Sequence, residues 1–123
     1  MIISAIDDSP MPEREPLLDA LRRRFGDDRV ELFVPRSADF DLNVTPADAP
    51  PFRVTALDAA TLTVDGMPDQ NAVVAAVVRE LLPADFARVV AFEPEGNVFV
   101  DLVPGITAAQ VEAGWRDLSE GGF

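Results

Sequence analysis

The chain lacks four residue types that carry much of known enzyme chemistry: cysteine, histidine, tyrosine and lysine. Without cysteine it can form no disulfide, thiolate zinc site or iron–sulfur cluster, and it has no cysteine nucleophile. Without histidine it loses the commonest metal ligand and the commonest general base. Because all ten basic residues are arginine, a Schiff-base lysine and a P-loop lysine are excluded as well.

What remains offers little chemistry. The serines have no histidine or lysine to activate them, and the sequence contains no G-x-G-x-x-G, G-x-S-x-G or D-T-G motif. With 22 acidic residues, carboxylate pairs of the kind used in acid–base catalysis arise by chance. We therefore expect a protein that is no enzyme and needs no cofactor or metal. A small carboxylate-dependent enzyme is kept as an alternative.

The charge is strongly acidic, with a formal net charge of −12 at pH 7 and a pI of about 4.1. Residues 1–50 carry eleven acids and six arginines, and residues 51–123 carry eleven acids and four arginines, so the acidity is spread along the chain. Such a surface disfavours nucleic acid, whose phosphates require basic residues, and is repelled by anionic membranes. It fits a basic protein partner. Acidity that only keeps the protein soluble is the other interpretation.

Length and hydropathy predict one domain, residues 1–123. No apolar run reaches the roughly 20 residues needed to span a bilayer. The opening MIISAIDD has no basic region of the kind that begins a signal peptide. A cytoplasmic protein is therefore expected.

The hydrophobic pattern predicts an α+β fold, a mostly antiparallel sheet of five to seven strands with three helices. The helices are expected at roughly 16–26, 69–82 and 107–119. Asp69 is the expected cap of the second helix. The third begins with a capping box, Thr107 to Gln110, and the spacing of Val111, Trp115 and Leu118 extends it to 119.

A hairpin around Glu93–Asn97 is the clearest strand signal. Pairing of Glu93 with Asn97, with Gly96 supplying the positive φ, would set its register. The face predicted to enter the core then carries Arg88, Val90, Phe92, Val98, Val100 and Leu102. Phe99 and Asp101 would lie on the opposite, lighter face, which needs a cover from this chain, a second copy or a partner.

Residues 39–44 alternate polar and apolar, which predicts a half-buried strand with Asp39, Asp41 and Asn43 in a row outside. The row also spells D-x-D-x-N, the opening of a calcium loop. Val44 replaces the glycine needed at the sixth position of that loop, and Pro50 replaces the glutamate needed at the twelfth. We interpret the row as an acidic strand face.

These observations favour a protein-binding module of the immunity or antitoxin kind, which would neutralise a cognate toxin by occluding a basic surface. The candidate partner contacts are Asp39, Asp41, Glu93 and Glu95, with Phe99 and Asp101 as an apolar anchor and its neighbour.

The alternative is a secretion chaperone. The order helix, strands, helix, hairpin, helix resembles the acidic chaperones of type III secretion systems, and the FEPEGNVFVDL hairpin followed by a helix carries the likeness. A first strand near the N-terminus and further strands within 52–64 depart from that pattern. The resemblance implies a homodimer that binds a secreted client protein.

Overall fold

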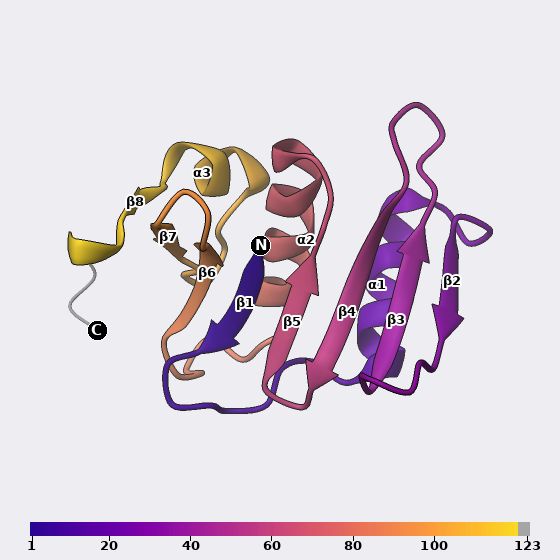
Figure 1. Ribbon diagram of the computed structural model, residues 1–123, viewed down its shortest axis with the longest axis horizontal. Coiled ribbons are helices and arrows are strands. Elements are labelled where there is room, and N and C mark those ends of the chain that lie inside the picture. The colour runs from indigo at the N-terminus through magenta and orange to yellow at the C-terminus, as the bar shows by residue number, and fades with distance from the viewer. Residues whose placement is uncertain (121–123) are drawn as a thin grey trace.

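Eight strands form one antiparallel sheet in a computed structural model that describes residues 1–120 (Figure 1). Their order across the sheet is β2-β3-β4-β5-β1-β6-β7-β8. The α+β class and the three helices are as predicted, but the strand count of five to seven was too low. The strands are β1 (Ile2–Ala5), β2 (Val30–Phe33), β3 (Phe40–Val44), β4 (Phe52–Asp58), β5 (Thr61–Val64), β6 (Val89–Glu93), β7 (Val98–Asp101) and β8 (Arg116–Asp117).

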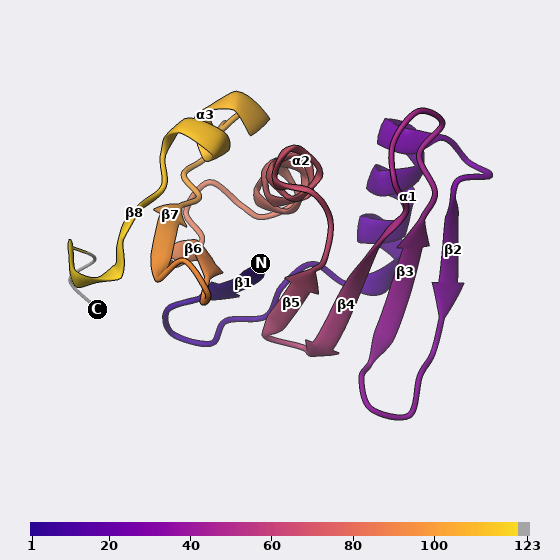
Figure 2. The ribbon, with the colours of Figure 1, turned by 45° about the horizontal axis from the view of Figure 1, so that its top comes forward.

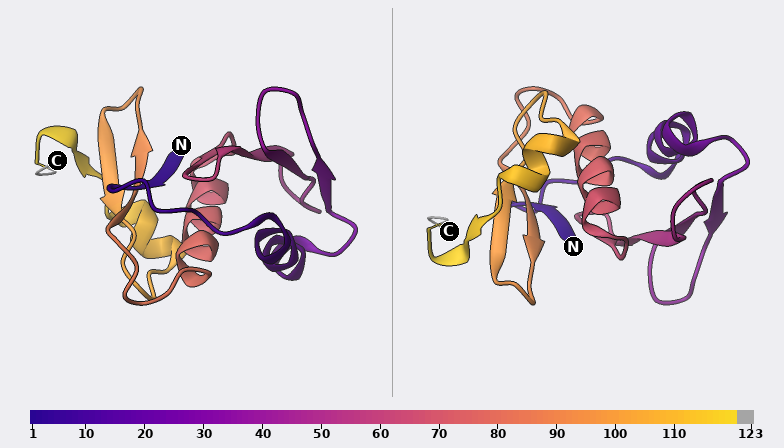
Figure 3. Two further views of the ribbon diagram at one scale, coloured as in Figure 1. Left: turned by 90° about the horizontal axis from the view of Figure 1, so that it is seen from below. Right: turned by 90° about the horizontal axis from the view of Figure 1, so that it is seen from above.

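The helices are α1 (Arg14–Phe25), α2 (Pro68–Glu80) and α3 (Ala108–Ala113), with a 3₁₀ turn at Leu118–Glu120. They lie on one side of the sheet, and α3 packs against α2 (Figures 1 and 3). The sheet bends around α2, which Figure 2 shows nearly end-on between the two parts of the sheet. Within residues 1–120, no α-helix lies against the opposite face, which is called the open face below. None of the helices described has the length and apolarity to cross a membrane.

Strand β1 joins the two parts of the sheet. Ile3 pairs with Leu62 of β5 on one side and with Ala91 of β6 on the other. The buried residues of the central strands, such as Ile3 and Leu62, belong to one apolar cluster that also includes Leu17, Leu21, Val74 and Val78 of the helices. The core is therefore continuous across both halves of the sheet.

The alternation predicted for β3 is confirmed. Phe40, Leu42 and Val44 are buried, and Asp41 and Asn43 alternate with them. Pairing across the sheet continues this alternation into one row on the open face that crosses all eight strands. In strand order the row is Phe33, Asp41, Thr55, Thr63, Ile2, Phe92, Phe99 and Arg116.

The register predicted for the β6–β7 hairpin was wrong by one residue. Glu93 pairs with Val98, not with Asn97. The loop therefore holds four residues, and Asn97 takes the positive φ (54°) that was assigned to Gly96. Because a one-residue shift turns a strand over, the core face of β7 pairs with the other face of β6. The residues of the hairpin that join the core cluster are Val89, Ala91, Val100 and Leu102.

The third helix is much shorter than predicted. Its capping box is confirmed, since Gln110 N donates to Thr107 Oγ1 at 3.2 Å and Thr107 N donates to Gln110 Oε1 at 3.0 Å. The helix ends at Ala113, and Arg116 pairs with Phe99 as part of β8. The spacing of Val111, Trp115 and Leu118 is thus not a helical stripe.

Gln70 caps the start of helix α2, a role that had been predicted for Asp69. Gln70 Oε1 accepts from Met67 N at 2.8 Å, and Gln70 Nε2 donates to Pro50 O at 2.8 Å. Asn71 Oδ1 accepts from Gly66 N at 2.9 Å. Gln70 and Asn71 are both buried, so these contacts tie the helix start to the preceding loops.

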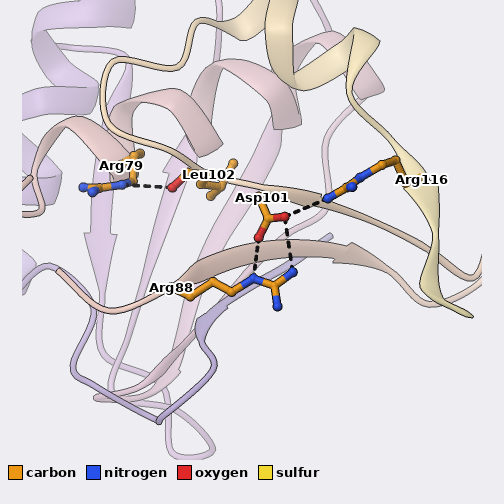
Figure 4. Close-up of polar contacts among 5 residues, drawn as sticks. All are labelled: Arg79, Arg88, Asp101, Leu102 and Arg116. Atoms are coloured by element: carbon orange, nitrogen blue, oxygen red, sulfur yellow. Dashed lines mark hydrogen bonds and ion pairs between the residues drawn. The ribbon is translucent and has the colours of Figure 1, made fainter. Parts of the chain in front are cut away.

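At its other end, α2 carries a buried cation, Arg79, which is 3% exposed. Its Nε donates to Leu102 O at 2.9 Å (Figure 4), and its Nη1 donates to Leu82 O at 3.1 Å. The guanidinium thus satisfies a carbonyl just beyond the helix end and another just beyond β7.

Candidate functional site

The six predicted contact residues lie in three separate places. Asp39 and Asp41 belong to the β3 region, whereas Glu93 belongs to β6. The strands β4, β5 and β1 lie between β3 and β6, a separation of about 19 Å along the sheet at roughly 4.8 Å per strand. The predicted residues therefore do not form one patch.

Glu93 and Glu95 lie together at the turn of the β6–β7 hairpin. They line a hollow of about 570 Å³ with Met1, Asp65 and neighbouring residues. The amino group of Met1 is 3.6 Å from Glu93 Oε1 and donates to Val64 O at 2.9 Å. Part of the negative charge of Glu93 is thus balanced within the chain.

Phe99 and Asp101 are adjacent on the open face, where the chain itself buries Phe99 and pairs Asp101 with two arginines. Phe99 is 0% exposed, and the guanidinium carbon of Arg116 lies 4.7 Å from its ring centroid. Asp101 accepts from Arg88 Nε at 2.6 Å and from Arg116 Nη2 at 2.8 Å (Figure 4). The hydrogen bond to Asp101 raises the pKa of Arg88 above its ordinary value. As the structure stands, Phe99 is not exposed as an anchor.

Asp39 borders a groove of about 460 Å³ whose lining is mainly apolar. Three segments meet there, at the lower end of the sheet in Figure 1: Pro10–Glu15, which leads into α1, the start of β3, and the β4–β5 turn. Backbone bonds fix them together, because Met11 N donates to Ala59 O at 2.8 Å and Asp39 N donates to Ala56 O at 2.9 Å. We call this feature the acidic groove.

The floor of the acidic groove is apolar and firmly packed. Met11 and Phe40 are only 5% and 7% exposed, and Ala56 and Leu62 are also buried. All four belong to the main core cluster. A floor made of packed core side chains keeps its shape without a ligand.

The rim of the acidic groove carries four carboxylates, Glu13, Glu15, Asp39 and Asp58, against the single guanidinium of Arg14, formally −3. Arg14 Nε is 3.1 Å from Glu15 Oε1, so these two charges pair. Asp58 Oδ1 accepts from Ala60 N at 2.8 Å. No hydrogen bond or ion pair among residues 1–120 involves the side chains of Glu13 or Asp39. Both remain available to a cation.

A turn just before the groove wall is also stabilised by a carboxylate. Asp7 Oδ1 accepts from the hydroxyl of Ser9 at 2.6 Å and from its amide at 3.1 Å. These hydrogen bonds lower the pKa of Asp7 below its ordinary value, the hydroxyl contributing most. The turn therefore holds its geometry at neutral pH, where Asp7 is ionised.

Asp41, one position along the open face from Asp39, has a different environment. Its Oδ1 is buried and has no hydrogen-bond partner in the described structure. It lies between Phe33 and Thr55 in the row that crosses the sheet.

Glu13, Asp58 and the groove floor were not predicted from the sequence. Pro10 and Pro12 lie in the lead-in to α1 and Pro16 lies in its first turn, but no local signal places that lead-in beside the β4–β5 turn. The contact is tertiary, between residues 11 and 59.

Within residues 1–120, no group of three or more acidic side chains is placed to hold a metal ion. The rim carboxylates of the acidic groove come from separate segments: Glu13 precedes α1, Asp39 precedes β3 and Asp58 ends β4.

Comparisons with protein-family models, with curated proteins and with solved structures find no match to this chain.

Proposed function

We propose that this protein is a non-enzymatic binding module of the immunity or antitoxin kind, which neutralises a basic protein by covering its basic surface. The acidic groove is the observation that carries the proposal. It combines a packed apolar floor with an excess of carboxylates at the rim, and a protein interface of this kind joins shape and charge complementarity.

The charge of the whole chain supports the same function. A net charge of −12 steers a basic partner toward the surface from a distance, and the groove then gives a specific contact. Asp39 contributes to the groove rim and Asp41 lies beside it in β3, and the proposal assigns both to the partner contact. Glu93 and Glu95 form a second acidic area at the turn of the β6–β7 hairpin.

The test uses the product of the neighbouring gene as the partner. Its rate of association with this protein is measured at about 20 mM and 150 mM NaCl. Screening at the higher salt, where the Debye length is about 8 Å, should slow association markedly. The double variant Asp39→Asn, Asp58→Asn should also slow it, and Glu95→Gln, which removes a distant exposed carboxylate, should have a smaller effect. An association rate that is insensitive to both salt and the double variant would refute the proposal.

A secretion chaperone is the second candidate, and one feature favours it. Strand β2 is an edge strand, and the large apolar residues Phe33 and Val34 at its end are 48% and 68% exposed. An exposed edge can pair with a second copy or with an extended client peptide. The molar mass in solution separates the two proposals, because the chaperone requires a homodimer and the inhibitor is expected to be a monomer.

A further inference from the structure

The acidic groove is shaped for one particular kind of side chain. Its floor is apolar over the core residues Met11, Phe40 and Leu62, and its charge is confined to the rim. An occupant must therefore bring an apolar portion to the floor and a cation to the opening. Among amino-acid side chains only lysine and arginine combine an aliphatic stem with a positive end.

The arrangement of the rim distinguishes between these two. Glu13 precedes α1, Asp39 precedes β3, and Asp58 ends β4, so the carboxylates come from three different segments. A guanidinium presents five N–H donors in a rigid plane and can serve several separated acceptors, whereas an ammonium is a compact point charge. The separated carboxylates favour the guanidinium.

The chain already contains one arginine held in this way. Arg116 lies over the ring of Phe99 at 4.7 Å and donates to Asp101 at 2.8 Å. The carboxylate of Asp101 (Figure 4) and the aromatic ring of Phe99 together hold its guanidinium. The acidic groove offers the same two elements, Phe40 in the floor and Asp39 at the rim.

We infer that the acidic groove receives a single arginine side chain of the basic partner, with its stem against Met11 and Phe40 and its guanidinium between Glu13, Asp39 and Asp58. This inference rests on the proposed function, since it names the group by which the partner is held. The arginine is the anchor of the interface, and the surrounding acidic surface supplies steering.

The experiment uses short peptides as probes, with the full chain observed by ¹H–¹⁵N NMR. Acetyl-Gly-Arg-Gly-amide is compared with the citrulline peptide, which has nearly the same shape without the charge. The arginine peptide should give saturable shifts at the amides of Met11, Asp39 and Ala60. Because charge-assisted hydrogen bonds are stronger than neutral ones, the arginine peptide should bind at least about tenfold more tightly than the citrulline peptide. The lysine peptide should bind less tightly than the arginine peptide.

Two variants locate the site. Asp39→Asn and Asp58→Asn should each weaken binding of the arginine peptide several-fold. Glu112→Gln, which removes an equal charge at an exposed position of α3, should leave it unchanged. The spectrum of each variant verifies that the fold is retained. Equal binding of the arginine and citrulline peptides, or shifts centred on the β6–β7 turn, would overturn the inference.

Failure of the anchor and failure of the proposed function give different results. If the arginine peptide does not bind but partner association still depends on salt and on the rim carboxylates, only the anchor is wrong. If the arginine peptide binds and the partner associates without regard to salt or to these carboxylates, the proposed function is wrong.

Discussion

Arg79 is a cation that the fold has removed from water without an acidic partner. Its guanidinium donates to the carbonyls of Leu82 and Leu102, and within the described residues it forms no ion pair. Burial of an unpaired charge is costly, and only good hydrogen bonds offset that cost. The two carbonyls must therefore be held firmly in place, which links the end of α2 to the end of β7.

Replacing Arg79 with methionine should destabilise the protein by about 2 kcal/mol, because two buried carbonyl groups lose their donors. Urea denaturation followed by circular dichroism measures this loss. Arg23→Met, an exposed change on α1, is the matched control and should alter the free energy of unfolding by less than about 0.5 kcal/mol. An Arg79→Met protein as stable as the parent would show that the two hydrogen bonds only offset the desolvation of the guanidinium.

At the same scale, the sequence was informative where the pattern is local. The alternation of β3 placed Phe40 and Leu42 inside and Asp41 outside, as observed. The hairpin turn was less informative, since both Gly96 and Asn97 accept a positive φ. Asn97 takes it, and the resulting register decides which face of β6 pairs with the face of β7 that carries Phe99.

Among the elements, α2 shows how polar side chains that are not part of the apolar stripe of a helix can decide where the helix begins. Gln70 bridges Met67 N and Pro50 O, and Asn71 holds Gly66 N. A Cβ at Gly66 would lie 2.9 Å from Gln70 Oε1, so this turn has no room for a larger residue. The buried amides thus specify the start of the helix and its contact with the loop before β4.

Gln70→Leu should lower the free energy of unfolding by about 2 kcal/mol, because two hydrogen bonds are lost in a buried position. Gln110→Leu is the matched control, since Gln110 has the same place in the capping box of α3 and is exposed there. Its cost should be about 0.5–1 kcal/mol. Thermal or urea unfolding compares the two, and an equal cost would contradict the role given to burial.

Elements beyond the capping signals were harder to predict. Val111, Trp115 and Leu118 have helical spacing, yet the chain leaves the helix at Gly114 and continues as β8. The competing interaction is tertiary: Arg116 pairs with Phe99 in the sheet and with Asp101 through its side chain. The hydrophobic periodicity within residues 107–119 contains no information about this tertiary partner. The contact between residues 11 and 59 beside the acidic groove could not be predicted for the same reason.

On the scale of the whole molecule, the excess of negative charge opposes folding. A net charge of −12 is brought together when the chain becomes compact, and self-repulsion then lowers stability. Part of this repulsion is between the carboxylates at the rim of the acidic groove. A basic partner that binds there would reduce the repulsion.

Raising NaCl from about 20 mM to 500 mM should therefore raise the unfolding midpoint by a few degrees, since salt screens repulsion between exposed carboxylates. For a chain of this size, such a rise corresponds to about 1 kcal/mol. Differential scanning calorimetry measures it, with chloride preferred to sulfate because sulfate also strengthens apolar burial. A falling midpoint would mean that local ion pairs such as Arg88–Asp101 outweigh the repulsion.

The central position of β1 in the sheet has a consequence for how the protein folds during its synthesis on the ribosome. Ile2–Ala5 precede every other strand in the chain, yet their partners are Thr61–Val64 and Val89–Phe92. During synthesis, β1 must wait until the first of these partners emerges, and its second edge must wait longer still. The strands β2, β3 and β4 need only their sequence neighbours, so this meander can form early. During synthesis the β2–β4 meander would then fold first. Strand β1, although made first, would be among the last strands to gain both of its neighbours in the sheet.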